Sequence, residues 1–331
     1  MGLLSSIEAF RFKDTVFYKE NSDLQDRYDA LKRLNEEYPN NEELLSELYI
    51  IKKGLDGENE IAYQLKKSNI GMYILRDIKV KYEDLTAQID YVIITPVFIY
   101  YVECKNLVGN ITVNEKGDFI RELNINGKII KKGMNSPLTQ VEAQREVLRK
   151  IWEKNTSTIK KMFASSNYEY YRRVLVVAAN QDTILNTSKA PSDMKYKVLR
   201  ADSLTRQIQY EIDHRDRLDP IEYKKDMESI AQYYLDISSN DVVDYYNYYK
   251  EKYCNNNTVT VVDDLKDRLI ELRKNRSSEM GIPAYYVFTN EELDKLVEIR
   301  PETLDELKNS NILPEIKVKT HGEEIVKEII K

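Results

Sequence analysis

The stretch from Gln88 to Asn106, QIDYVIITPVFIYYVECKN, decides the fold prediction for this chain. Two runs rich in Val, Ile and Tyr flank Thr95-Pro96, a composition typical of two β-strands joined by a short turn. Charges interrupt these apolar runs, with Asp90 in the first and Glu103 and Lys105 in the second. A buried strand seldom carries charge unless the charge has a partner or a function.

The spacing of these three charges suggests chemistry. Side chains alternate along a strand, so Glu103 and Lys105 share a face. A turn centred on Pro96-Val97 places Asp90 opposite Glu103, where like charges repel. A divalent cation between the carboxylates would turn repulsion into attraction, and oxygen ligands suit Mg²⁺ or Mn²⁺. An Asp followed by Glu-x-Lys resembles the PD-(D/E)xK nuclease core, although a salt-bridged edge hairpin with a solvated face would also explain it.

The composition narrows the candidate chemistry. The chain has 331 residues, enough for two globular domains, and a net charge of −6, so it is not a uniformly basic nucleic-acid coat. It has two cysteines, Cys104 and Cys254, and two histidines, His214 and His321, which leaves carboxylates as the expected catalytic groups. No long apolar run or secretory signal peptide is visible, so we expect a cytoplasmic protein without a membrane partner.

The N-terminal part is predicted to be a helical extension. Helical apolar spacing favours helices at Asp23–Glu37 and Asn41–Lys53. Gly54 and Gly57 predict a turn, followed by a new helix that carries Glu58 in its first turn. The helix dipole stabilises a carboxylate there by at most about 1 kcal/mol, which is a sufficient structural reason for Glu58. Alternatively, Glu58 points at the metal site as an additional ligand, directly or through water.

Strands on both sides of the hairpin predict a meander of about five or six strands. They are expected at Gly71–Tyr82, Gly109–Val113, Phe119–Leu123 and Lys128–Ile130, with a turn at Asn126-Gly127. Asn135-Ser136-Pro137 then opens a long helix, with Ser136 as its N-cap. Basic residues outnumber acidic ones from Lys128 to Arg173, so either this surface faces phosphates or it is simply a solvated helix face. The candidate substrate contacts on this helix are Gln140, Gln144, Arg145 and Arg149.

Four motifs occur in the order of the nuclease-related domain, NERD, which the chain resembles over about residues 50 to 215. They are Gly54-x-x-Gly57-Glu58, Gln88-Ile89-Asp90, Val102-Glu103-Cys104-Lys105-Asn106 and Asn135-Ser136-Pro137-x-x-Gln140. The resemblance implies an α/β (α+β) restriction-endonuclease-like core, with a mixed central sheet flanked by helices. Tyr91 stands where the family often has His, and Cys104 where it usually has a small aliphatic residue, Thr or Val.

The last 70 or so residues resemble an HRDC domain, the small all-α module at the C-termini of RecQ-type helicases and RNase D. The strings GIPAYYVF, residues 281–288, and IRPETLDEL, residues 299–307, carry this resemblance. In the family this module often helps to bind nucleic acid. Leu313-Pro314 replaces a glycine-containing turn of the family and the segment is slightly acidic, so protein contact stays open as well.

The predicted layout has four parts. They are a helical extension (1–50), a NERD nuclease-like domain (51–215), a Tyr-rich helical linker (216–258) that ends at Asn255-Asn256-Asn257, and a separate HRDC domain (259–331). Pairs of tyrosines can stack nucleic-acid bases, but more often they pack helices together, and we favour packing here.

The proposed chemistry is metal-dependent hydrolysis of a phosphodiester bond. Asp90 and Glu103 would ligate Mg²⁺ or Mn²⁺, with the Cys104 backbone carbonyl completing the shell. Glu58 would join as an outer ligand or help to hold a second metal. Lys105 would orient or help to deprotonate the attacking water.

Two glutamines are expected to assist the lysine or the substrate. Gln88 falls opposite Lys105 in the predicted hairpin, where it would steady the lysine. Gln140 would contact the substrate backbone or the attacking water.

The sequence therefore predicts a Mg²⁺-dependent nuclease, with DNA favoured over RNA, acting in DNA repair, processing or phage defence. Retention of Glu58, Asp90, Glu103 and Lys105 favours the enzyme. The alternatives are a non-catalytic DNA-binding or scaffold protein with a nuclease fold, or a nuclease that acts only with a helicase or other protein partner, since no GxxxxGK[ST] motif is present. A homodimer would suit cleavage of both strands, but no sequence feature demands one.

Overall fold

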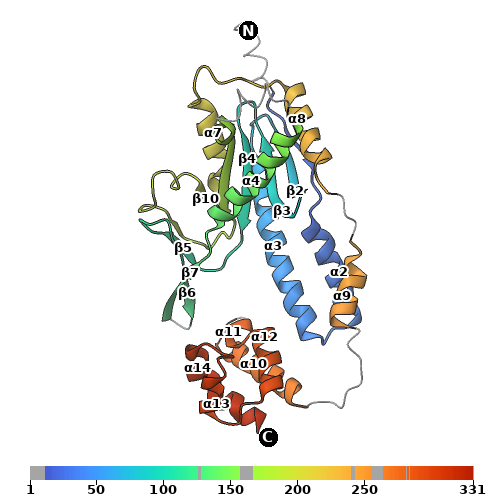
Figure 1. Ribbon diagram of the computed structural model, residues 1–331, viewed down its shortest axis with the longest axis vertical. Coiled ribbons are helices and arrows are strands. Elements are labelled where there is room, and N and C mark those ends of the chain that lie inside the picture. Colours follow the sequence, from blue (N-terminus) through green and yellow to red (C-terminus); the bar gives the residue numbers. More distant parts are fainter. Residues whose placement is uncertain are drawn as a thin grey trace. The chain divides into compact units, whose positions relative to one another are not determined.

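A computed structural model describes residues 12–125, 128–156, 167–239, 243–254, 264–280, 282 and 284–330 (Figure 1). The chain divides into two compact units. The larger extends to Glu122 and from Lys131 to Lys250, and the smaller comprises Leu123–Ile130 and Glu251–Lys331. The predicted Asn126-Gly127 turn, the linker asparagines 255–257, and residues 281 and 283 of the HRDC-like string lie outside the described residues. Within the described part of the chain, no helix has the length and apolar character needed to cross a membrane.

A mixed six-stranded sheet forms the centre of the larger unit, as predicted. Strand β3 runs antiparallel to its neighbours β2 and β4, whereas β1, β8 and β10 each pair in parallel with a neighbour. The strand order is β1 (Thr15–Lys19), β2 (Met72–Tyr82), β3 (Leu85–Ile94), β4 (Ile99–Lys105), β8 (Arg172–Ala178) and β10 (Val198–Arg200).

The hairpin predicted from residues 88–106 forms with the predicted turn. The Thr95 N–H donates to the Phe98 carbonyl at 3.0 Å, which closes the turn around Pro96-Val97. The paired residues of β3 and β4 run from Ile94–Ile99 to Tyr91–Val102, which is the predicted register. Beyond that point β4 continues alongside β8, as far as the pair Lys105–Ala178. The two hairpin strands therefore part just before Asp90 and Glu103.

Helices cover both faces of this sheet (Figure 1). One face packs against α4 (Pro137–Asn155) and α8 (Lys224–Asp236), and the other against α3 (Glu42–Lys66) and α7 (Leu204–Asp213). Ser136 caps α4 as predicted, because its Oγ accepts from the Thr139 N–H at 3.1 Å. Since both faces are covered, β4 is apolar from Ile99 to Val102, and β8 is apolar from Val174 to Ala178.

The N-terminal part differs from the prediction in two ways. Residues Thr15–Lys19 form strand β1 instead of a helix, whereas α2 has the predicted bounds, Asp23–Glu37. The predicted turn at Gly54 and Gly57 is wrong, because α3 is one continuous helix through both glycines. A Cβ on Gly57 would lie 2.6 Å from the Asn106 Cβ. The glycine thus permits close packing of α3 on the end of β4, and Glu58 lies in mid-helix.

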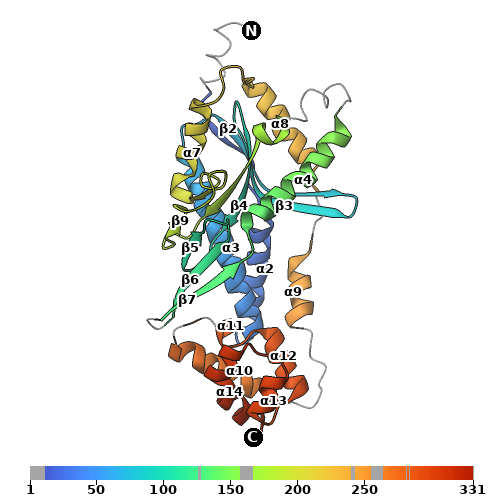
Figure 2. The ribbon, with the colours of Figure 1, turned by 60° about the vertical axis from the view of Figure 1, so that its left-hand side comes forward.

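The predicted meander is divided between two sheets. A second, four-stranded sheet has the order β7 (Lys128–Met134), β6 (Phe119–Ile125), β5 (Asn110–Val113) and β9 (Leu185–Asn186). Because β8 occupies the free edge of β4, β5 cannot join the central sheet. In Figure 2 the strands β5, β6 and β7 lie together, apart from the central strands. Two further short elements of the larger unit are α6 (Tyr168–Tyr171) and the 3₁₀ turn η2 (Ala201–Ser203).

The Tyr-rich helix α9 (Tyr245–Tyr253) packs against α2, which is the interpretation favoured from the sequence. Tyr245 donates a hydrogen bond to the Asp23 carboxylate. The Arg27 Nε donates to the Tyr249 hydroxyl at 2.7 Å, and the ring of Tyr246 lies under the Arg33 guanidinium at 4.2 Å.

The smaller unit contains the expected all-α module. Its helices are α10 (Asp264–Met280), α11 (Ala284–Val287), α12 (Asn290–Ile299), α13 (Leu304–Asn309) and α14 (Glu315–Ile329). Thr289 and Glu292 form a capping box at the start of α12, and Thr303 caps α13. Fully buried Phe288 and Leu293 belong to its core.

Candidate active site

The alternation of side chains between the two faces of β2 shifts by one residue at Arg76-Asp77. Tyr73 and Leu75 contribute to the cluster under α4, and so does Ile78, one residue out of step with strict alternation. Asp77 lies at the irregularity with φ of 52°, in the left-handed region that residues other than glycine rarely adopt. Such irregularities re-aim side chains and are common beside active sites.

Strand β3 has a matching irregularity opposite this point. Ile89 and Val92 both face the cluster under α4, whereas Tyr91 faces the opposite cluster. Asp90 therefore lies where both strands depart from regular alternation. The irregularity brings Arg76, Asp77 and Asp90 to one level of the sheet.

The Asp90 carboxylate spans the gap between the parting strands. Its Oδ2 accepts a hydrogen bond from the Cys104 N–H at 2.7 Å. Burial raises the pKa of Asp90 well above its ordinary value, and the neighbouring charge of Glu103 raises it further. The charges of Asp90 and Glu103 therefore lie near enough to interact.

Glu103 and Lys105 share a face and contact each other, as predicted. Glu103 is 3% exposed, and its Oε1 lies 2.6 Å from the Lys105 Nζ. The lysine also donates to Gln140 Oε1 at 3.1 Å, and Gln144 Nε2 donates to Glu103 Oε2 at 3.3 Å. Of the two glutamines on α4, Gln140 therefore supports Lys105 and Gln144 supports Glu103.

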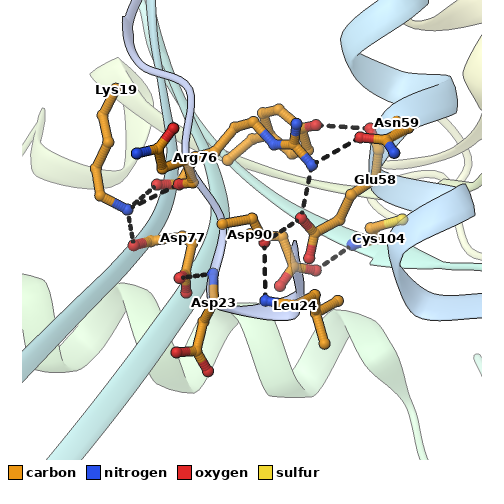
Figure 3. A network of polar contacts seen from close by, with 12 residues as sticks. Lys19, Asp23, Leu24, Glu58, Asn59, Arg76, Asp77, Asp90 and Cys104 are labelled. Atoms are coloured by element: carbon orange, nitrogen blue, oxygen red, sulfur yellow. Dashed lines mark hydrogen bonds and ion pairs between the residues drawn. The ribbon is translucent and has the colours of Figure 1, made fainter. Parts of the chain in front are cut away.

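Glu58 reaches the site from the middle of α3, so the helix-dipole explanation does not apply. Its Oε2 accepts from Ser22 Oγ at 2.7 Å and from Arg76 Nη2 at 3.0 Å (Figure 3). Burial raises the pKa of Glu58, while the hydrogen bonds from Ser22 and Arg76 oppose that rise. In Figure 3 the Glu58 and Asp90 carboxylates lie next to each other, and the charge of Glu58 contributes to the raised pKa of Asp90.

The donor set fits a hard divalent cation. Among the described residues, no group of three or more His, Cys, Asp or Glu side chains is placed to hold a metal ion. Asp90 and Glu103 nevertheless offer two adjacent carboxylates, and Mg²⁺ commonly binds through one or two carboxylates with water completing its shell. The Cys104 side chain packs against the apolar cluster under α3 and α7, and a thiol suits Mg²⁺ poorly, which leaves the Cys104 carbonyl as its donor.

Family models match both parts of the chain. The nuclease-related domain model, NERD, matches residues 53–177, and the HRDC domain model matches residues 263–329. The chain carries a NERD domain and an HRDC domain. No curated protein and no solved structure matches it. Both domains suspected from the motifs are thereby confirmed, and Glu58, Asp90, Glu103 and Lys105 all lie within the NERD match.

Three residues of the NERD domain that were predicted to support Lys105 or to contact the substrate have other partners. Gln88 Nε2 donates to Asp77 Oδ1 at 2.7 Å, and Gln88 pairs with Lys79 across β2 and β3, so the expected support of Lys105 does not form. Arg145 is buried and its Nη2 lies 2.8 Å from Glu169 Oε2.

Arg149 lies on the same helix and is also paired with acidic groups. Its Nε lies 3.1 Å from Glu153 Oε1, and its Nη1 lies 3.7 Å from Glu146 Oε1. Arg145 and Arg149 are therefore not proposed as phosphate contacts, because their charges are already balanced.

Sequence reasoning missed Ser22, Arg76 and Asp77 of the site. A signal for Arg76 and Asp77 was available, since these two charges interrupt the apolar strand MYILRDIKVKY where its alternation changes phase. Ser22 had no such signal, because its contact with Glu58 spans 36 positions of sequence.

Proposed function

We propose that this protein is a divalent-cation-dependent nuclease that hydrolyses phosphodiester bonds of DNA. The observation that carries the proposal is the meeting of Asp90, Glu103 and Lys105 where β3 and β4 part, within a NERD domain. The HRDC domain supports nucleic acid as the substrate. Such an activity would serve DNA processing, DNA repair or phage defence.

Asp90 and Glu103 would hold Mg²⁺ or Mn²⁺, together with the Cys104 carbonyl. When bound, the cation would polarise a phosphate oxygen and neutralise charge that develops in the transition state. Two carboxylates placed this close repel each other, so the protein gains free energy when a cation binds between them. This gain would supply part of the affinity for the cation.

Lys105 would position the attacking water and stabilise the phosphate charge. Its ammonium group has three N–H donors, of which Glu103 and Gln140 each receive one. The third donor would bind the water or a phosphate oxygen. The Lys105 side chain is 27% exposed, so a substrate can reach it, whereas Glu103 beneath it is nearly buried. Gln140 therefore acts on the lysine, instead of on the substrate as the sequence suggested.

Cleavage of labelled single-stranded, duplex and branched DNA tests this proposal. Wild type would be compared with Lys105→Ala and with Lys81→Ala, which removes an exposed lysine elsewhere in the central sheet. We expect cutting with Mg²⁺ or Mn²⁺, no cutting with EDTA, and loss of cutting only in Lys105→Ala. Equal cutting by Lys105→Ala would reject the assignment of the site.

A second outcome would favour a different class of function. If wild type and Lys105→Ala bind DNA equally and neither cuts it, the protein is a DNA-binding scaffold or needs a partner such as a helicase. Addition of a helicase to the same assay would separate these two cases.

A further inference from the structure

The junction between β1 and α2 inserts a buried hydroxyl beside Glu58, although it precedes the NERD match. Ser22 is 2% exposed and is the N-cap of α2, where its Oγ accepts from the Leu24 N–H at 3.3 Å. A serine hydroxyl has one hydrogen to donate. That hydrogen is directed to Glu58 Oε2, at 2.7 Å.

Arg76, on strand β2, donates a hydrogen bond to the same oxygen of Glu58. Arg76 is 6% exposed, and its Nη2 contacts Glu58 Oε2 at 3.0 Å and Asn59 Oδ1 at 3.1 Å. Tyr91 donates to the Glu58 backbone carbonyl at 2.6 Å, and its ring lies 5.5 Å from the Arg76 guanidinium carbon. The side chain and the main chain of Glu58 are therefore both fixed.

The junction is itself anchored to the irregularity in β2. Lys19 Nζ donates to the carbonyls of Arg76 and Asp77, each at 2.8 Å. The Asp23 N–H donates to Asp77 Oδ2 at 2.7 Å (Figure 3). These bonds set the position of Ser22, which lies between Lys19 and Asp23 in the chain.

We infer that Ser22 and Arg76 are positioning residues that aim Glu58 at the cation site formed by Asp90 and Glu103. This inference rests on the proposed nuclease function. Both contacts occupy Oε2, and Figure 3 shows the other carboxylate oxygen directed toward Asp90. Held there, Glu58 accepts hydrogen bonds from water bound to the cation, while Arg76 balances its charge. The N-terminal segment is therefore part of the active site.

The test measures Mn²⁺ affinity directly, from the electron paramagnetic resonance signal of free Mn²⁺, beside DNA cleavage. Ser22→Gly removes the hydroxyl, and glycine is itself an acceptable N-cap, so α2 is expected to remain folded. We expect Mn²⁺ binding to weaken about tenfold, since partners that orient a metal site are typically worth 10- to 100-fold in affinity. Ser22→Thr keeps the hydroxyl and is expected to restore binding.

A double-mutant cycle separates positioning from general destabilisation. In a Glu58→Gln background, Ser22→Gly is expected to have no further effect on Mn²⁺ affinity, because its target carboxylate is gone. Arg76→Gln leaves Glu58 buried without its counter-charge, so its effect on Mn²⁺ affinity is compared with that of the double variant Arg76→Gln/Glu58→Gln, which is expected to bind Mn²⁺ no more weakly than Glu58→Gln alone. Asn41→Gly removes the N-cap side chain of α3, the helix that carries Glu58, at the end far from the site; it is the matched control and is expected to bind Mn²⁺ as wild type does.

The possible outcomes distinguish this inference from the function on which it rests. Unchanged Mn²⁺ affinity in Ser22→Gly, with wild type that binds and cuts, overturns the inference and leaves the nuclease proposal standing. A loss that persists in the Glu58→Gln background also overturns it, because Ser22 would then act through another group. Wild type that neither binds Mn²⁺ nor cuts DNA overturns both.

Discussion

The Cys104 N–H donates a 2.7 Å hydrogen bond to the Asp90 carboxylate, at the level where the β3–β4 pairing ends. The Cys104 N–H of β4 thus bonds to the Asp90 side chain, where in a continued hairpin it would bond to a backbone carbonyl of β3. The bond holds the parting strands at a fixed separation and keeps Asp90 beside Glu103. The two carboxylates therefore stay close together in the folded protein, although their repulsion costs stability.

Replacement of Asp90 by Asn is expected to stabilise the cation-free protein. Asn keeps an oxygen to accept from the Cys104 N–H but carries no charge, so the repulsion from Glu103 is removed. A gain of about 1 kcal/mol corresponds to a melting temperature roughly 2–4 °C higher. Thermal unfolding in EDTA and in Mn²⁺ measures both effects, because stabilisation by Mn²⁺ should disappear. Asp84→Asn, an exposed change in the turn between β2 and β3, is the control, and a lower melting temperature for Asp90→Asn in EDTA would contradict the argument.

Replacement of Gln140 by Ala is expected to slow cleavage without weakening DNA binding. Gln140 Oε1 accepts from Lys105 Nζ at 3.1 Å, so its loss frees the lysine to move while Glu103 still holds it. We expect kcat to fall about tenfold, because a less well positioned lysine slows the chemical step, with KM unchanged. Thr139→Ala, at the neighbouring exposed position of α4, should leave both constants unchanged. A rise in KM with unchanged kcat would indicate a substrate contact instead.

The two glycines of α3 are expected to respond oppositely to alanine. At Gly57 a Cβ would lie 2.6 Å from the Asn106 Cβ, which cannot move without the backbone, so Gly57→Ala should destabilise by about 1–3 kcal/mol. At Gly54 the nearest atom is the Leu24 Cδ1 at 3.1 Å, the end of a flexible side chain. Gly54→Ala should therefore be neutral, or stabilising by up to about 1 kcal/mol through helix propensity. Urea unfolding measures both, and equal effects would show that packing at Gly57 is not tight.

The smaller unit is expected to lose stability in mild acid because of His321. This histidine is buried, and burial lowers its pKa, with the charges of Arg276 and Lys317 lowering it further. Those cations are paired with Glu324 and Glu292. The unfolded chain then binds a proton more readily than the folded one, so stability is constant above the ordinary histidine pKa of 6.5 and falls as pH drops below it. The steepest slope is about 1.4 kcal/mol per pH unit.

Nuclear magnetic resonance can follow this titration directly in the full chain. The sequence contains only His214 and His321, so two imidazole signals are expected, and His214→Gln assigns them. His321→Leu should remove the acid dependence of unfolding near pH 6. A His321 signal that titrates at or above 6.5 would contradict the prediction.

Local patterns predicted much of the fold because the forces behind them act between near neighbours. The turn at Pro96-Val97, the bounds of α2 and the Ser136 cap of α4 depend on residues within a few positions of one another. The prediction failed at Gly54 and Gly57, where composition suggested a turn. There the reason for glycine is contact with Leu24 and Asn106, which lie far away in the sequence.

The hairpin, the placement of Glu103 and Lys105 on one face, and the pair of domains could all be predicted from the chain, since alternation and motif order are properties of its sequence. Three features appear only in the folded protein: β4 pairs with β8, Glu169 neutralises Arg145, and Glu58 contacts Ser22 and Arg76. These contacts join segments far apart in the sequence. They form only when packing has brought buried charges together, because a buried charge must then find a partner in space.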